Sequence, residues 1–201
     1  MPEAPAPSTI GAMTETESVR RPGLLDRWPT ALALVAIAGA VTVIVWSDRD
    51  AELFGPSVAT MAGIYLMAYA IGRPWTAWPA FAVLSVVMTG LHLLKINPAI
   101  GITAVVVLLW LWTVARRRFT DRETFSIQTA GMIIFAAITL WCAAVDPVLG
   151  TALAGVGFLA HGVWDAYHFK IDKVVNRPWS EFCGVIDFAT GTALIIAAAT
   201  A

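Results

Sequence analysis

Charged residues are scarce in this sequence of 201 residues. Asp, Glu, Lys and Arg make up 13% of the chain, whereas a soluble domain usually carries about 25%. This scarcity disfavours a soluble fold, because few charged side chains remain to cover a water-exposed surface. The two cysteines do not indicate a disulfide framework. A formal net charge of −1 gives no electrostatic basis for binding nucleic acid, which is therefore not expected as a partner.

The sequence is instead rich in long apolar segments. Hydrophobic residues make up 58% of the chain and gather in seven segments, each close to the roughly 20 residues that a helix needs to cross a bilayer. The segments span residues 28–46, 54–71, 75–94, 98–115, 125–145, 147–169 and 178–201. The sequence therefore predicts an all-α membrane protein, in which residues 24–201 form a seven-helix transmembrane bundle in the lipid bilayer. Residues 1–23 lack the apolar content to pack and predict a disordered cytoplasmic tail.

Residues that favour helix starts stand at several of these segments. Pro147 and Pro178 suit a first helical turn, where their missing N–H is not needed. Thr120 and Glu123 have the spacing of a capping box, which predicts that Thr120 caps the fifth helix.

Lys and Arg fall almost entirely on one side of the predicted bundle. If successive helices alternate in direction, every Lys and Arg except Arg49 and Lys95 belongs to the N-terminal tail or to the turns after the second, fourth and sixth segments. Cytoplasmic loops of membrane proteins carry an excess of these residues. The pattern therefore predicts a cytoplasmic N-terminus, an outside C-terminus and a multi-pass protein of a bacterial-type inner (plasma) membrane.

Two short matches suggest an internal repeat. Residues 73–75 and 177–179 both read Arg-Pro-Trp and open the third and seventh helices. Residues 63–65 and 162–164, Gly-Ile-Tyr and Gly-Val-Trp, are similar in the second and sixth helices. Together they are compatible with a 3+1+3 parallel repeat, a plan known from transporters. Chance similarity between apolar helices is the alternative.

Ionisable residues interrupt the apolar sequence between residues 161 and 188. Each one costs free energy in lipid, so such residues inside a membrane point to a functional site. His161, Asp165 and His168 recur at helical spacing, which places them on one face of the sixth helix. Trp164 borders this face.

The seventh helix carries Cys183 and Asp187 one turn apart, again on one face. Because a short loop joins the sixth and seventh helices, we expect them to lie antiparallel beside each other. Counting residues from that loop at about 1.5 Å each brings pairs of side chains to equal depth. The expected pairs are His161 with Asp187, Asp165 with Cys183, and His168 with Glu181.

These residue types suit acid/base or metal-assisted chemistry on a lipid-like substrate. A histidine paired with a carboxylate is a general base whose tautomer the carboxylate fixes. On this basis His161, Asp165 and Asp187 are predicted to be catalytic. Imidazole, carboxylate and thiolate are also ligands of zinc or iron, and a bound ion could activate water. The predicted metal ligands are His161, Asp165, His168 and Cys183.

Two other interpretations remain open. Chains of Asp and His inside membranes act as proton relays, so the protein could be a proton-coupled transporter or channel for a small solute. That function requires a polar path to His92, Lys95 and Asp146, near the predicted outer face. The third interpretation is a non-catalytic structural or partner-binding subunit, because buried polar pairs join helices for about 1 kcal/mol. A homo-oligomer is compatible with all three.

Overall fold

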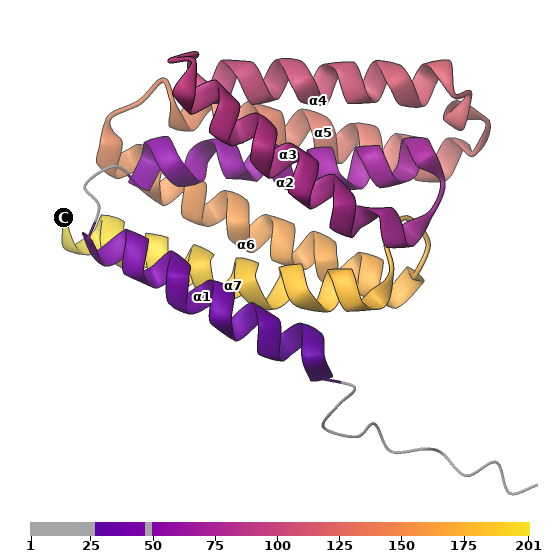
Figure 1. Cartoon of the computed structure of the whole chain (residues 1–201). Coiled ribbons are helices and arrows are strands. Elements are labelled where there is room, and N and C mark those ends of the chain that lie inside the picture. Colours follow the sequence, from indigo (N-terminus) through magenta and orange to yellow (C-terminus); the bar gives the residue numbers. More distant parts are fainter. Residues whose placement is uncertain (1–26, 47–49) are drawn as a thin grey trace, which may run out of the picture.

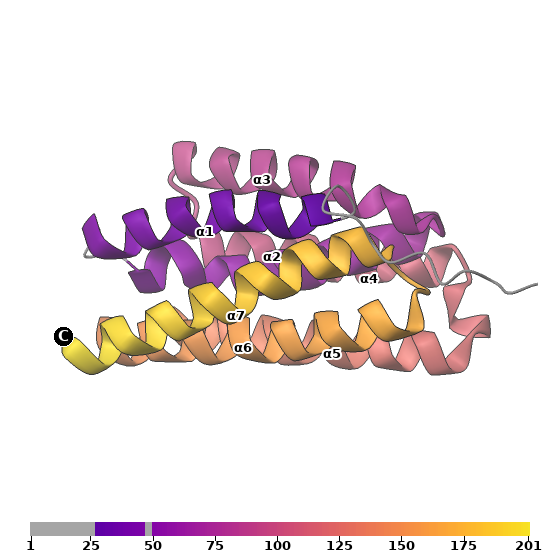
Figure 2. The same cartoon turned by 90° about the horizontal axis from the view of Figure 1, so that it is seen from below.

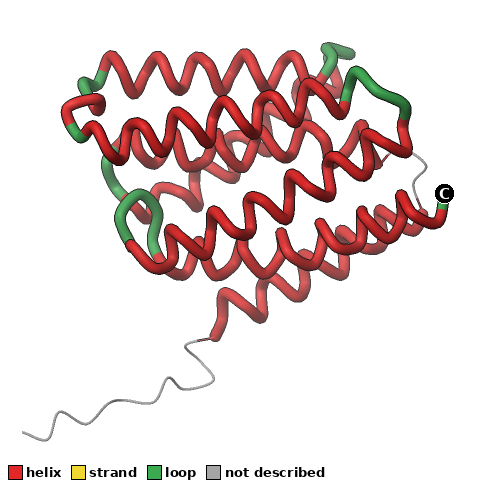
Figure 3. Tube along the Cα trace, turned by 180° about the vertical axis from the view of Figure 1, so that it is seen from behind, coloured by secondary structure: helices red, strands yellow, loops and turns green. Residues whose placement is uncertain are grey.

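A computed structural model describes residues 27–46 and 50–201, and this part of the chain contains helices and turns but no strand. Seven of its helices are long and apolar enough to cross a membrane, which indicates a multi-pass membrane protein (Figures 1 and 3). They are α1 (Trp28–Trp46), α2 (Asp50–Ile71), α3 (Ala77–Leu93), α4 (Pro98–Ala115), α5 (Arg122–Cys142), α6 (Pro147–Ile171) and α7 (Arg177–Thr200). The predicted tail, residues 1–23, lies outside the described residues.

Successive helices alternate in direction, so the bundle has two ends (Figure 1). We call them the Lys95 end, where α2, α4 and α6 begin, and the Arg118 end, where these helices finish. Helix α2 is the most buried of the seven and packs against α3, α4, α5 and α6, whereas α1 is the least buried and lies along α7 (Figure 2). A side chain in the middle of α2 therefore faces several helices at once.

The predicted helix limits agree closely with the structure. Both α1 and α4 have the predicted bounds, and α2 begins one turn earlier than expected, at Asp50. Pro147 and Pro178 lie in the first turns of α6 and α7, as predicted. The membrane orientation and the 3+1+3 repeat stay predictions.

The residue that caps α5 differs from the predicted one. Asp121, not Thr120, is the capping residue, and its side chain accepts a hydrogen bond from the N–H of Thr124 at 3.4 Å. Lys173 Nζ lies 2.9 Å from Asp121 Oδ2, and this hydrogen-bonded ion pair lowers the pKa of Asp121 and raises that of Lys173. The loop between α6 and α7 is thereby attached to the start of α5. The hydroxyl of Thr120 instead donates a hydrogen bond to the carbonyl of Arg117 at 3.1 Å.

The backbones of α6 and α7 approach each other closely at Gly155 and Gly191. A Cβ atom added at Gly191 would lie 2.8 Å from the carbonyl oxygen of Gly155. One added at Gly155 would lie 3.0 Å from the carbonyl oxygen of Gly191. Such small residues allow helices in lipid to pack backbone against backbone. This contact brings the polar faces of α6 and α7 together.

A side chain of α5 also enters the backbone hydrogen bonding of α2. The hydroxyl of Thr139 accepts a hydrogen bond from the N–H of Ala59 and donates one to the carbonyl of Gly55, both at 2.9 Å. Gly55 and Ala59 are one turn apart, so Thr139 bridges one step of the α2 ladder. The bridge fixes α5 against α2 close to the Lys95 end.

Candidate functional site

The centre of the site is His161, which is fully buried between α6 and α7. Its Nδ1 atom lies 2.8 Å from Asp187 Oδ2 on α7 and 3.3 Å from Asp165 Oδ2, one turn further along α6. Both aspartates are buried as well. The expected pair of His161 and Asp187 is therefore present, and Asp165 joins it.

Tyr65 brings a third helix into the site. Its hydroxyl donates a hydrogen bond to Asp165 Oδ1, and the whole side chain is buried in the second half of α2. Tyr65 was not among the residues predicted to form the site. The available signal was its position as a hydroxyl-bearing side chain in the apolar second segment, but periodicity alone cannot show which helix α2 faces.

Replacing Tyr65 by Phe is expected to destabilise the bundle by about 1–3 kcal/mol, because Asp165 Oδ1 would stay buried without its donor. The measurement is the midpoint of thermal unfolding of the detergent-purified variant beside the wild type. Tyr167→Phe is the matched control, since the side chain of Tyr167 is exposed on the same helix as Asp165. Equal losses in both variants would contradict a specific role for the Tyr65 hydroxyl.

Several buried polar atoms near His161 have no hydrogen-bond partner among the described residues. They are His161 Nε2, Asp165 Oδ2 and Trp164 Nε1. Buried polar atoms are nearly always paired, so a group of unpaired ones calls for an explanation. A water molecule or a polar group of a ligand would satisfy them.

Aromatic rings pack against the His161 ring. The ring of Phe135 on α5 lies 4.9 Å from the His161 ring, centre to centre, and that of Tyr65 lies 5.5 Å away. Trp164 packs edge-on against both of these rings. His161 Nε2 is therefore a free nitrogen in an aromatic environment.

His168 lies toward the Arg118 end and makes different contacts from those expected. Its Nδ1 is 2.9 Å from the carbonyl oxygen of Trp164, so Nδ1 carries the proton. Its Nε2 is 2.9 Å from Gln128 Nε2 on α5 and accepts from that amide. Both nitrogens are therefore occupied, and His168 lies outside the group formed by His161 and the two aspartates. Gln128 is a second contact that the sequence analysis missed.

The expected pair of His168 and Glu181 does not form. Glu181 instead accepts a hydrogen bond from the hydroxyl of Thr30, and Arg27 Nη1 lies 3.7 Å from Glu181 Oε1. Thr30 lies in the first turn of α1, and Arg27 directly precedes that helix. The position of α1 does not follow from counting residues along α6 and α7. Glu181 thus connects α1 to α7 at the Arg118 end.

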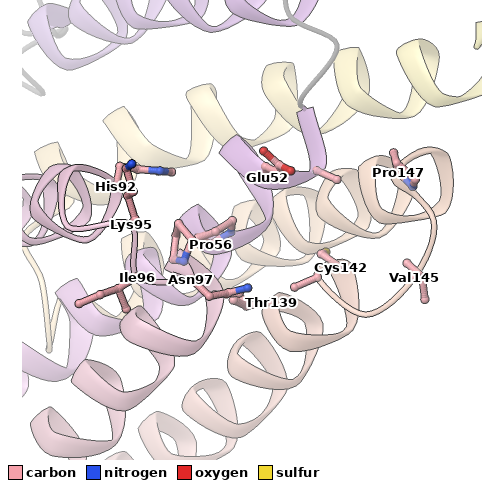
Figure 4. A pocket seen from close by; sticks show the side chains of 14 residues that line it. Glu52, Pro56, His92, Lys95, Ile96, Asn97, Thr139, Cys142, Val145 and Pro147 are labelled. Atoms are coloured by element: carbon pink, nitrogen blue, oxygen red, sulfur yellow. The ribbon is translucent and has the colours of Figure 1, made fainter.

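Two other predicted residues, Cys183 and His92, are not among the three whose ligand atoms converge. Cys183 is a buried free cysteine that packs in the hydrophobic core with Trp179 and Phe182, and its sulfur is not part of the His161 group. His92 is exposed at the Lys95 end, where it lines a pocket of about 520 Å³ together with residues from α2, α4, α5 and α6 (Figure 4). A further cavity of about 740 Å³ lies at the same end, between α1, α6 and α7.

The three central residues offer a candidate metal-ligand set. One ligand atom each from His161, Asp165 and Asp187 lies within 4.8 Å of the others. Ligand atoms about 2.0–2.1 Å from a tetrahedral zinc ion stand roughly 3.3 Å apart, yet His161 Nδ1 and Asp187 Oδ2 are 2.8 Å apart, a hydrogen-bond distance. A metal-bound histidine also usually donates its other N–H to a partner, and Nε2 has none among the described residues. The geometry fits a hydrogen-bonded pair better than a metal shell.

The arrangement has the chemical requirements of a general base. A carboxylate holds one nitrogen of a buried imidazole, and the other nitrogen is free to take a proton. No family model matches this chain, and neither does any curated protein or solved structure.

Proposed function

We propose that this protein carries out acid/base chemistry on a lipid-like substrate within the membrane, with His161 as the general base. The supporting observation is the asymmetry of the His161 ring. Its Nδ1 is held at 2.8 Å by Asp187, and its Nε2 is buried without a partner among the described residues.

Each polar side chain has a distinct role in this proposal. Asp187 accepts the Nδ1–H and keeps the lone pair on Nε2, which receives a proton from the substrate. Asp165, at 3.3 Å from Nδ1, stabilises the imidazolium that forms. Tyr65 orients Asp165 through its hydrogen bond. The imidazolium then returns the proton to another atom of the substrate or to water, which regenerates the base.

The depth of His161 indicates the substrate class. His161 is 14 residues after Pro147 and 10 residues before Ile171, which corresponds to about 21 Å and 15 Å along α6. The base therefore lies well inside the hydrocarbon region of a bilayer about 30 Å thick. The rings of Phe135 and Tyr65 pack against the His161 ring, and Trp164 packs against both of them. A membrane-soluble molecule with one polar reacting group fits these surroundings.

The experiment compares lipid extracts by mass spectrometry from cells that express the wild type, His161→Gln or His92→Gln. We expect a lipid-soluble species to change in abundance with the wild type and with His92→Gln, but not with His161→Gln. General-base catalysis typically contributes about 10²- to 10⁴-fold to a rate. The change in abundance of the lipid-soluble species should therefore be undetectable in cells that express His161→Gln. Identical extracts from all three strains would refute the proposal.

Elemental mass spectrometry of the wild type and the two variants, purified in detergent, distinguishes a metal centre from a metal-free base. About one zinc or iron per chain in the wild type, lost in His161→Gln and retained in His92→Gln, would replace the metal-free base by a metal centre. If the His161→Gln variant folds, its lipid extract matches that of the wild type, and neither protein contains metal, the buried polar pairs have a structural role only.

A further inference from the structure

The pocket at the Lys95 end is hollowed between five helices. Exposed ionisable side chains, Glu52, His92 and Lys95, stand along its wall, and buried Thr139 and Cys142 belong to its lining (Figure 4). Its volume of about 520 Å³ accommodates on the order of ten water molecules at about 30 Å³ each. The pocket thus extends polar surroundings from this end of the bundle into its interior.

One helical turn separates the pocket lining from the ring that covers His161. Thr139 lines the pocket, and Phe135 is one turn before it on the buried face of α5, which is a distance of about 6 Å along the helix. The Phe135 ring lies 4.9 Å from the His161 ring and is 3% exposed. Phe135 therefore stands between the pocket and the base.

Toward the Arg118 end, the described contacts of His161 lead to buried side chains. His161 faces Asp165 on its own helix, Asp187 on α7 and Tyr65 on α2, and all three are buried. Beyond them, His168 is fixed in one tautomer by a backbone carbonyl, and its second nitrogen accepts from the Gln128 amide. An amide side chain is neither an acid nor a base near neutral pH, so this chain of contacts ends without a proton carrier.

We propose that the pocket is an aqueous vestibule through which His161 exchanges protons with the solvent at the Lys95 end, and that Phe135 is the gate between them. The role assigned to this exchange rests on the proposed function, since a base that returns its proton to water needs such a route. Displacement of the Phe135 ring lets water reach Nε2, which is unpaired among the described residues. A proton then passes between Nε2 and a water molecule, and no other bond changes.

The test uses diethyl pyrocarbonate, which acylates a neutral imidazole nitrogen, on the full chain in lipid nanodiscs. The extent of modification of His161 is followed by peptide mass spectrometry in the wild type, Phe135→Ala and Phe182→Ala. Phe182 is a buried phenylalanine on α7 in the other part of the core, so its truncation controls for a cavity as such. We expect His161 to react at least about tenfold faster in Phe135→Ala than in the other two proteins.

A blocking experiment identifies the route. Phe135→Ala is combined with Lys95→Cys at the pocket wall and with alanine at Cys142 and Cys183, and the new cysteine is labelled with a bulky maleimide. We expect the label to return the His161 rate to the wild-type value. Equal rates of His161 acylation in Phe135→Ala and Phe182→Ala would overturn the proposal that the pocket is a vestibule. A rate of acylation that the label does not change would overturn it as well.

Failure of the vestibule and failure of the proposed function give different results. The acylation experiment needs no turnover, so a fast, blockable reaction in Phe135→Ala supports the vestibule even if lipid extracts show no product. Conversely, a lipid product that depends on His161, together with no effect of Phe135→Ala, keeps the base and removes the vestibule.

Discussion

Replacing Asp187 by Asn is expected to lower turnover by about 10³- to 10⁴-fold, as the loss of an orienting carboxylate does in other histidine-based sites. Asn keeps the size of the side chain, but its amide can donate to His161 Nδ1. The proton of the neutral imidazole then moves to Nε2, and the free base is lost. The hydrogen bond between His161 and Asp187, 2.8 Å long, is what the substitution alters.

Nitrogen NMR of histidine-labelled protein measures this change directly, because the chain has only 3 histidines. The wild type should show His161 protonated at Nδ1, and Asp187→Asn should show it protonated at Nε2. Asp146→Asn is the control, since Asp146 caps α6 at the Lys95 end and accepts from the N–H of Leu149. An unchanged His161 spectrum in Asp187→Asn would mean that Asp187 does not set the tautomer.

Gly191→Ala is expected to destabilise the bundle by about 1–3 kcal/mol, the usual cost of adding a methyl group to a packed contact. The new Cβ would lie 2.8 Å from the carbonyl oxygen of Gly155, a backbone atom that cannot rotate away. Helices α6 and α7 must therefore separate, and the contact between His161 and Asp187 should lengthen with them.

The midpoint of thermal unfolding in detergent checks this expectation, with Gly90→Ala as the control. A Cβ at Gly90 has nothing within 4 Å, and alanine favours a helix over glycine. We expect Gly90→Ala to leave the midpoint unchanged or to raise it slightly. A Gly191→Ala protein as stable as the wild type would show that α6 and α7 tolerate a wider separation.

The sequence by itself was sufficient to predict the helices and one central contact of the site. Apolar runs of membrane length and prolines in first turns define local structure, because helix formation in lipid satisfies every backbone group within one segment. The pairing of His161 with Asp187 also followed from local information. A short loop makes α6 and α7 antiparallel neighbours, so counting residues from the loop gives equal depth.

Only the tertiary structure decided which other helices complete the site. Tyr65 on α2 and Gln128 on α5 are far from α6 in sequence, and their contacts depend on how each helix is rotated about its own axis. Equal depth in the bundle predicted that His168 and Glu181 would be partners. The rotation of α6 and α7 about their axes instead turns His168 toward α5 and Glu181 toward α1. The aromatic surroundings of His161 are likewise a tertiary property, since Phe135 and Tyr65 pack against its ring from two other helices. Periodicity places a side chain on a face, and packing of the whole bundle determines what that face meets.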